Sequence, residues 1–241
     1  MSRLDTVQWG ADRLRISPWR GDHRIAHVAP APGHALSASS VAHCLRTLRR
    51  RGYHSVLTSA LNPDEQQPFL AQGFSVHEHL HLLRRDLDDD FPVATGAPTR
   101  RGRRRDHAAV LRVDHLAFDA FWRFDRSGLD DARRATPTSR FRVVALDHEI
   151  VGYAVTGRAG PVSYLQRLAV DPAHQRQGLA RVLVLDALGW ARRSGSTTML
   201  VNTQEANDAA LALYHALGFE PERQGLDVLE RGLDDAAGTT P

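Results

Sequence analysis

The sequence contains no lysine, so all of its 31 Lys or Arg side chains are arginines. The formal net charge at neutral pH is only +3. The isoelectric point of about 9.6 therefore reflects the very high pKa of the guanidinium group and not a large excess of positive charge. A basic isoelectric point of this origin does not indicate a nucleic-acid-binding protein.

Cysteine is almost absent: the single Cys44 excludes an internal disulfide and favours a reducing compartment. Cys44 falls on the apolar side of an expected helix, which is typical of a small core residue and not of a nucleophile. Long apolar runs are missing too, because Arg181 and Asp186 interrupt the richest segment, 179–191. The N-terminus lacks the pattern of a signal peptide. These features predict a cytoplasmic protein without a membrane span.

What the sequence does contain is apolar material for a core. The chain has 241 residues, of which 42% are hydrophobic and 24% are charged. These values are typical of a globular protein and exclude a mainly disordered chain. An acidic, proline-bearing segment predicts a linker at 88–98, and the composition of 233–241 predicts a disordered tail. We therefore expect two domains, at 1–87 and 99–232.

Both expected domains alternate strands with helices. In the first we expect a strand at 23–29, a helix capped by Ser39 or Ser40 and stopped by Gly52, a strand at 53–58, a helix between Asn62 and Gly73, and a strand at 74–83. The second is expected to begin with a short strand at 99–105, helices from Asp106 and near 129–135, and a hairpin of 141–146 with 150–156. We then expect a strand at 162–170, a helix at 178–193, a strand at 198–203, a helix at 207–217 and a last extended segment.

The chain contains an internal repeat. The segment NPDEQQPFLAQGF, 62–74, aligns without a gap with NDAALALYHALGF, 207–219, and the asparagine, glycine and second phenylalanine of the first segment are matched. Strands and helices precede and follow both segments in the same order. The repeat predicts two copies of one design, of which the first is shortened.

The most informative segment joins an apolar strand ending at Val170 to a helix through the letters QRQGLA. The start of a helix presents free N–H groups and the positive end of the helix dipole, and small residues allow close approach of a phosphate. Gly178 and Ala180 are such residues. The pattern predicts an anion-binding loop, although by itself it fits an ordinary turn from strand to helix equally well.

This loop, the strand before it and the helix of 207–219 resemble the GNAT superfamily of acyl-CoA-dependent N-acyltransferases, whose diphosphate loop reads Gln/Arg-x-x-Gly-x-Gly/Ala. The resemblance covers about 99–231 in the expected order of elements. It implies an α/β fold of the α+β type, with a mixed, mainly antiparallel sheet flanked by helices, preceded by a smaller, truncated GNAT-like half. Ala180 stands where glycine is commoner, and it is a permitted variant.

The resemblance also implies that acetyl-CoA is the co-substrate and that no metal takes part. In this family the loop amides hold the diphosphate, the preceding strand pairs with the pantetheine arm, and the asparagine that starts the later helix often contacts the coenzyme. Carried over residue by residue, the implied coenzyme-binding set is Leu168, Ala169, Val170, Gln175, Arg176, Gln177, Gly178, Leu179, Ala180, Arg181 and Asn207.

Tyr214 matches the family tyrosine that donates a proton to the departing thiolate, and its alternative role is that of a half-buried helix aromatic. Where the ribosomal-protein N-terminal acetyltransferases of the superfamily carry a basic glutamate, this chain has Asn202, whose amide cannot accept the proton. Tyr164 and Asn202 together are candidates for ordering a proton-relaying water. Glu205 is the nearby carboxylate, and His174 lies in the loop. Ordinary strand or loop polarity explains these four equally well.

Four aromatic residues mark the junction of the first two helices of the second domain, which in this fold borders the acceptor site. Phe121 and Trp122, flanked by Phe118 and Phe124, are the candidate substrate-binding residues, and packing in the core is the alternative. The implied acceptor is an amine, either a protein N-terminus or a small molecule. Nothing in the sequence indicates the oligomeric state.

The first domain lacks the chemistry of the second at matching positions. Phe69 takes the place of Tyr214 and has no proton to give, and Pro30 and Pro32 remove N–H groups where 175–177 would supply them. The first domain is therefore expected to be a degenerate, inactive half. His77, His79 and His81 alternate along one strand without an evident carboxylate partner to complete a metal site, so we expect them on a half-exposed strand face. We also expect the arginines of 100–105 to lie on the solvated surface, where nearby acidic residues offset their charge.

The resulting hypothesis is an N-acetyltransferase that moves the acetyl group of acetyl-CoA to a primary amine by direct attack on the thioester. Two alternatives stay open at this point. One is a non-catalytic acyl-CoA-binding or sensor module, which the missing strand glutamate favours. The other is an arginine-mediated binder of acidic partners. Binding to nucleic acid or to a membrane is not expected.

Overall fold

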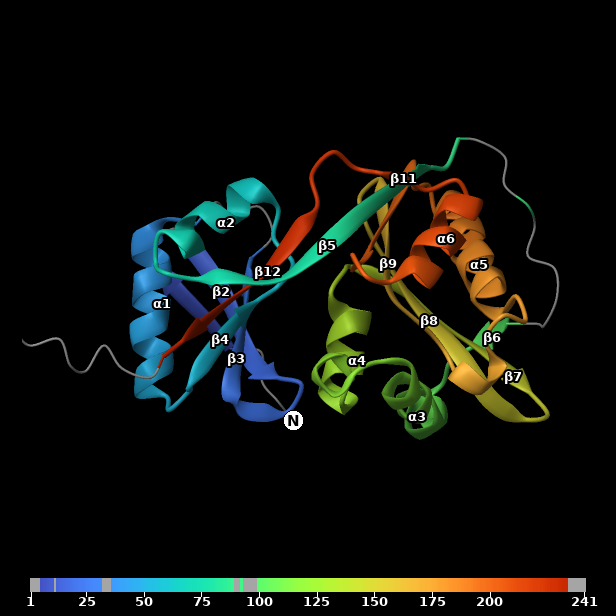
Figure 1. Cartoon of the computed structure of the whole chain (residues 1–241), viewed down its shortest axis with the longest axis horizontal. Helices are drawn as coiled ribbons and strands as arrows, with labels where there is room; N and C mark the ends of the chain where they lie inside the picture. Colours follow the sequence, from blue (N-terminus) through green and yellow to red (C-terminus); the bar gives the residue numbers. More distant parts are fainter. Residues whose placement is uncertain (1–4, 11, 32–35, 89–91, 93–98, 234–241) are drawn as a thin grey trace, which may run out of the picture. The chain divides into compact units, whose positions relative to one another are not determined.

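The computed structural model describes residues 5–10, 12–31, 36–88, 92 and 99–233 (Figure 1). The predicted linker, 88–98, and the predicted tail, 233–241, lie almost entirely outside these residues. The chain divides into two compact units, one of Met1–His81 with Arg223–Pro241 and one of Leu82–Glu222. No helix within the described ranges is long and apolar enough to cross a membrane.

The first unit is built from strands on which two helices pack. Its strand order is β1-β2-β3-β4-β12-β5. The elements are β1 (Asp5–Trp9), β2 (Asp12–Trp19), β3 (Asp22–Pro30), α1 (Ala38–Arg50), β4 (Ser55–Thr58), α2 (Pro63–Leu70), the first part of β5 (Ser75–Asp86) and β12 (Leu226–Gly232). The core of this unit joins α1 to β2, β3 and β4, and Cys44 lies within it as expected.

The second unit has the strand order β5-β10-β9-β8-β7-β6, with β11 added to β5. Its elements are the rest of β5, β6 (Thr99–Arg101), α3 (His107–Ala117), α4 (Arg126–Arg134), β7 (Thr138–Leu146), β8 (Glu149–Ala159), β9 (Val162–Val170), α5 (Leu179–Arg193), β10 (Thr198–Gln204), α6 (Asp208–Ala216) and β11 (Glu220–Pro221), with short 3-10 turns η1 (Arg104–Asp106), η2 (Ala120–Trp122) and η3 (Pro172–His174).

Helices cover both faces of the second sheet. One apolar cluster joins α5 and α6 to the sheet, and another joins α3 and α4 to its opposite face (Figure 1). Strand β8 is accordingly buried on both faces from Ile150 to Thr156. In each unit one pair of strands is parallel, β3 with β4 and β9 with β10, and the other registers that the structure defines are antiparallel. The predicted mixed, mainly antiparallel sheet flanked by helices is confirmed.

The repeated segments adopt the same local structure. Asn62 caps α2 by accepting from the N–H groups of Asp64 and Glu65, and Asn207 caps α6 by accepting from that of Ala210. The matched aromatic pairs pack alike. The ring centroids of Phe69 and Phe74 are 5.2 Å apart, and those of Tyr214 and Phe219 are 5.6 Å apart.

Several local expectations differ from the structure. Strands β1 and β2 had no predicted counterpart. Helix α1 is capped by Ser37, not by Ser39 or Ser40, because the Ser37 hydroxyl is the one that accepts from the Ser40 N–H. The Asp106 side chain does not cap α3; it accepts from Arg100 and from the N–H of Arg103.

The expected domains, 1–87 and 99–232, are continuous segments of the chain, whereas the first unit of the structure combines segments from both ends of the chain. Strand β12, expected within 99–232, pairs with β4 and β5 in the first unit. Residues 82–87, expected in the first domain, belong to the second unit, where the Leu87 N–H donates to the Thr197 carbonyl. A chain segment from each half of the sequence therefore completes the sheet of the other half.

Candidate active site

Strands β9 and β10 separate halfway along their length. Their parallel register runs from Val162 opposite Thr198 to Leu165 opposite Val201, while both strands continue beyond it. A β-bulge at Gln166 interrupts the register of β9 with β8 at the same level. Since a bulge bends its strand and re-aims its side chains, it accounts for the separation. Residues 166–170 therefore have no strand partner on the β10 side within the described chain.

The bulge also changes which side chains reach each face. Leu165 and Val170 lie in the cluster with α5 and α6, whereas Ala169 lies in the cluster with α3 and α4. Residues 165 and 169 would share a face in a regular strand, so one extra residue lies between them. That residue is Gln166, whose amide lies over Gly157, where a Cβ would approach Gln166 Nε2 to 2.4 Å.

Backbone groups on the open side of β9 are available to a ligand. The Asp171 N–H donates to the Val151 carbonyl of β8 at 2.8 Å. By strand alternation, the polar groups of Val170 and Leu168 then face away from β8, into the separation. The carbonyl of Val170 accepts from the Gln175 side chain at 3.3 Å. The predicted residues Leu168 and Val170 thus present their backbone to the gap, whereas the alternation turns the backbone of Ala169 toward β8.

The loop before α5 presents a run of free N–H groups. Within the described chain, no backbone N–H of residues 176–181 donates to a protein acceptor. Arg176 and Gly178 have left-handed backbones, with φ of 63° and 79°. Left-handed residues within such a loop curve successive N–H groups toward one point, where they can surround an anion. The helix dipole adds positive potential at the same point. The side chains of Gln175, Arg176 and Gln177 are exposed, and that of Leu179 is anchored in the core.

Tyr214 lies in the same apolar cluster as Leu168, Val170 and Leu179, which places it among the elements that form the loop and the gap. Its side chain is buried, and this burial raises its pKa well above the usual range. A phenol of this kind stays protonated at neutral pH. Within the described chain its hydroxyl has no hydrogen-bond partner. Asn207, by contrast, uses its side-chain carbonyl to cap α6, which leaves only its amide NH₂ group for a ligand.

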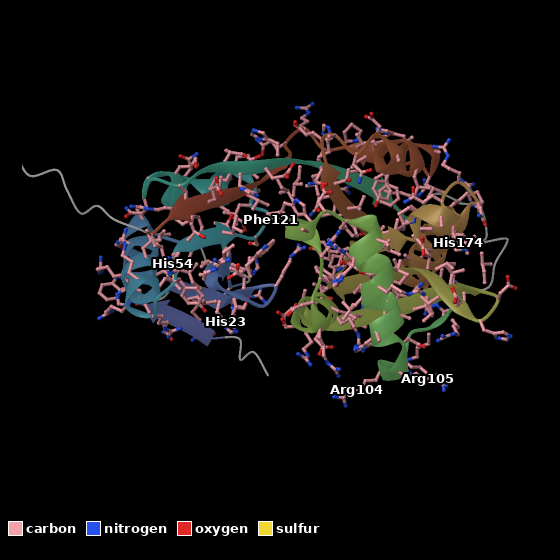
Figure 2. The ribbon with its side chains drawn as sticks, turned by 60° about the horizontal axis from the view of Figure 1, so that its bottom comes forward. His23, His54, Arg104, Arg105, Phe121 and His174 are labelled. Atoms are coloured by element: carbon pink, nitrogen blue, oxygen red, sulfur yellow. The ribbon has the colours of Figure 1, made fainter. Side chains whose placement is uncertain are left out.

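The candidates for the base lie near the gap but on different elements. Tyr164 stands opposite Leu200 in the β9–β10 register, and Asn202 follows two positions later on the same face of β10. Tyr164 is half-buried and Asn202 is exposed. Glu205 is exposed in the turn between β10 and α6. His174 lies in η3 beside the loop, with its Nδ1 atom 4.0 Å from the Asp171 carboxylate (Figure 2).

On the opposite face, the aromatic segment between α3 and α4 packs on an arginine that the sequence analysis missed. Phe121, labelled in Figure 2, lies in η2 together with Trp122. The ring centroids of Phe121 and Trp122 are 5.1 Å apart. The Arg167 guanidinium lies 3.4 Å from the ring centroid of Phe118 and 4.0 Å from that of Phe124. Phe118 and Phe124 thus pack on this guanidinium and against the apolar cluster of α3 and α4.

Arg167 is paired with a second missed residue, Asp114 of α3. Its Nε and Nη2 atoms donate to the two carboxylate oxygens of Asp114 at 2.8 and 3.0 Å. Tyr153 of β8 also donates to this carboxylate. The sequence does signal this pair, because Asp114 lies on the apolar stripe of an expected helix and Arg167 lies inside an apolar strand. Charges at such positions are almost always paired.

The corresponding helix start in the first unit has a different environment. There the Asp12 carboxylate accepts from the N–H and the hydroxyl of Ser37, both at 2.9 Å, and from the hydroxyl of Ser40. A carboxylate of the chain itself therefore occupies the N-terminus of α1. The residues 32–35, which include matches to the phosphate loop, lie outside the described chain.

One surface expectation needs correction. His77 and His79 do have carboxylate partners, Glu230 at 2.9 Å and Asp227 at 2.8 Å, across the β5–β12 pairing. They form separate pairs, and no metal-binding group is found among the described residues. Arg100 forms an ion pair with Asp106 at 2.7 Å, whereas Asp89 and Asp90, two of the acidic residues expected to offset it, lie outside the described residues.

The comparisons with known proteins agree with this geometry. A family model described as Acetyltransferase (GNAT) family matches residues 108–219. The mycothiol acetyltransferase of Thermomonospora curvata is 31% identical over 231 residues, which cover 85% of this chain and 76% of that protein. The N-alpha-acetyltransferase RimI of Mycobacterium tuberculosis is 34% identical over 139 residues, which cover 55% of this chain and 81% of that protein.

A solved structure of a tandem GNAT protein from the clavulanic acid biosynthesis pathway shares the fold. It covers 96% of this chain and 82% of its own, with a TM-score of 0.66 and 17% sequence identity. This likeness extends over both units, whereas the family model matches within the second unit only. The match to a curated relative over most of both chains shows the family. The chain belongs to the GNAT family and is a GNAT acetyltransferase.

Proposed function

We propose that this protein transfers the acetyl group of acetyl-CoA to the amine of a small molecule, and that the second unit carries the whole reaction. The observation that carries the proposal is the run of free N–H groups at 176–181, beside the open edge of β9. The free amides fit a diphosphate, and the free edge fits the amides of a pantetheine arm. Leu168 and Val170 would pair with that arm.

The reaction joins the amine nitrogen to the thioester carbonyl carbon and breaks the bond from that carbon to sulfur. Tyr214 donates its proton to the departing thiolate, a role that its place beside β9 supports, and burial keeps the phenol protonated until then. The amine loses a proton to water ordered by Tyr164 and Asn202, with Glu205 as the carboxylate that can receive it. Since α5 and α6 cover one face, the amine enters from the face of α3 and α4, which Phe121 and Trp122 border.

The relative that matches most of the chain supports a small acceptor. The mycothiol acetyltransferase matches 85% of this chain, whereas the N-alpha-acetyltransferase matches 55%. An acetyltransferase of protein N-termini is the alternative. We infer a small amine because the likeness to the first of these relatives extends over both units.

The test combines coenzyme binding with a screen of amines. Calorimetry measures the Kd for acetyl-CoA, and thiol release measures turnover with cysteine, glucosamine, spermidine, an aminoglycoside and an alanine-initiated peptide. We expect turnover with a small amine, and Tyr214→Phe should lower kcat about a hundredfold or more while the Kd for acetyl-CoA stays within about twofold. Turnover with the peptide alone would refute the small acceptor. Binding of acetyl-CoA without turnover of any amine would favour a sensor module.

A further inference from the structure

Arg167 and Asp114 form a buried ion pair at the acceptor side of β9. The Arg167 side chain is 10% exposed and that of Asp114 is fully buried. Two parallel N–H to oxygen bonds join them, and this fork geometry is specific to arginine. Tyr153 completes the carboxylate's shell as a donor, and burial raises the pKa of this phenol, so it retains its proton.

The pair also holds the backbone of the segment between α3 and α4. Arg167 Nη2 donates to the Trp122 carbonyl at 2.7 Å, and the Phe124 N–H donates to the Asp114 carboxylate at 2.6 Å. The rings of Phe118 and Phe124 cover the guanidinium. Residues 118–124 are thus tied to Arg167 by one backbone hydrogen bond and two aromatic contacts, and to its partner Asp114 on α3 by a second backbone hydrogen bond.

The position of Arg167 on β9 adjoins the coenzyme edge. Arg167 follows the bulge at Gln166 and precedes Leu168, whose backbone faces the gap. The same short stretch of β9 therefore carries the proposed coenzyme edge through its backbone and the acceptor-side segment through a side chain. Any shift of Arg167 relative to Asp114 moves Trp122 and its neighbour Phe121 relative to that edge.

We propose that Arg167 is a positioning residue, which sets the distance between the acceptor-side segment 118–124 and the coenzyme edge and thereby determines the affinity for the amine. This inference rests on the proposed function of the second unit. It assigns to Arg167 no contact with acetyl-CoA or with the reacting atoms. Its effect is on the KM of the amine.

The test uses Arg167→Lys with a matched control, Arg140→Lys. Arg140 makes the same two-bond pair with Asp186, with both donor to oxygen distances at 2.9 Å, but joins β7 to α5 away from the segment. Lysine keeps the charge and loses the fork in both variants. We expect Arg167→Lys to raise the KM of the best amine from the screen about tenfold or more, with the Kd for acetyl-CoA within about twofold. Arg140→Lys should leave both values unchanged.

Two further measurements keep the inference testable. Phe118→Leu retains the ion pair and removes one aromatic contact, so it should fold and raise the same KM in part. Hydrogen–deuterium exchange of residues 118–124 should speed up in Arg167→Lys and not in Arg140→Lys. Equal effects of the two lysine variants on KM and exchange would overturn the inference. If the wild type neither binds acetyl-CoA nor acetylates an amine, the proposed function fails, and the exchange comparison still decides whether Arg167 positions the segment.

Discussion

Placing a carboxylate at Gly178 tests the coenzyme site directly. Gly178 has a φ of +79°, and a Cβ built on it meets nothing within 4 Å. The variant Gly178→Glu therefore creates no clash, and its cost to folding is the left-handed strain of about 1–2 kcal/mol. The new charge stands at the free N–H groups of 176–181, where we expect the diphosphate.

The expected loss of affinity follows from Coulomb's law. A unit charge about 5 Å from another interacts by roughly 1 kcal/mol at the dielectric constant of water and by roughly 3 kcal/mol at the value of 20 typical of a protein surface. Since about 1.4 kcal/mol corresponds to a factor of ten, each phosphate charge raises the Kd by a factor of about 5 to about 140. Repulsion also weakens with salt, because the screening length falls to about 3 Å at 1 M.

Gly160 offers a matched control for this experiment. It also has a positive φ, +59°, and open space around its Cβ, but it lies in the turn between β8 and β9, at the other end of β9 from Val170. A strand of this length separates the two sites by more than about 20 Å, well beyond the screening length in physiological salt. Gly160→Glu makes the same chemical change under similar strain.

Calorimetric titration with acetyl-CoA should therefore show a strongly raised Kd for Gly178→Glu, an unchanged Kd for Gly160→Glu, and a partial recovery of the first variant at high salt. The variant Gly178→Ala isolates the backbone strain and should bind within a few fold of the wild type. An unchanged Kd in Gly178→Glu, or equal losses in both Glu variants, would refute the assignment of the loop.

Three more predictions concern the first unit. The Asp12 carboxylate fills the start of α1, so calorimetry should find one acetyl-CoA per chain, and Asp12→Ala should lower the free energy of unfolding by about 1–3 kcal/mol; two sites per chain would contradict this. Burial raises the pKa of Cys44 to about 12, so a thiol reagent at pH 8 should react only after unfolding. Burial and the nearby Arg20 and Arg15 lower the pKa of His27 to about 4. The unfolded chain then binds the extra proton, so stability should fall as the pH drops from about 6.5 toward 4, and a His27→Gln variant should lose this slope in acid denaturation.

Much of the architecture was predictable because its signals are local. Strand β9 has the predicted bounds, and α2 begins after the predicted cap, Asn62, because an asparagine followed by a proline and an acidic residue satisfies the first N–H groups of a helix. The loop before α5 was likewise visible as a run of small and polar residues between an apolar strand and an apolar helix. Each of these features depends on residues within one or two turns of each other.

The missed features depend on partners far apart in the sequence. Asp114 and Arg167 are 53 positions apart, and their pairing requires α3 to cross β9 at the bulge. Ser37 was missed as the cap of α1 although a serine was expected there, because three serines follow each other closely and Asp12 of β2 bonds two of them. Strand β12 reads as the end of the second domain, and only its pairing with β4 and β5 assigns it to the first unit.

The two helix starts explain why one fold, used twice, need not bind the coenzyme twice. Helix α1 connects the parallel strands β3 and β4, and helix α5 connects the parallel strands β9 and β10. The positive end of each helix dipole is therefore available to an anion. At α1 the anion is Asp12, whose bonds to Ser37 and Ser40 stabilise the helix. At α5 no side chain of the described residues caps the helix, and none of their acceptors takes up the amides of 176–181. Free amides at a helix start cost stability unless a ligand satisfies them, so the unit that leaves them free is the one whose stability should rise on binding acetyl-CoA.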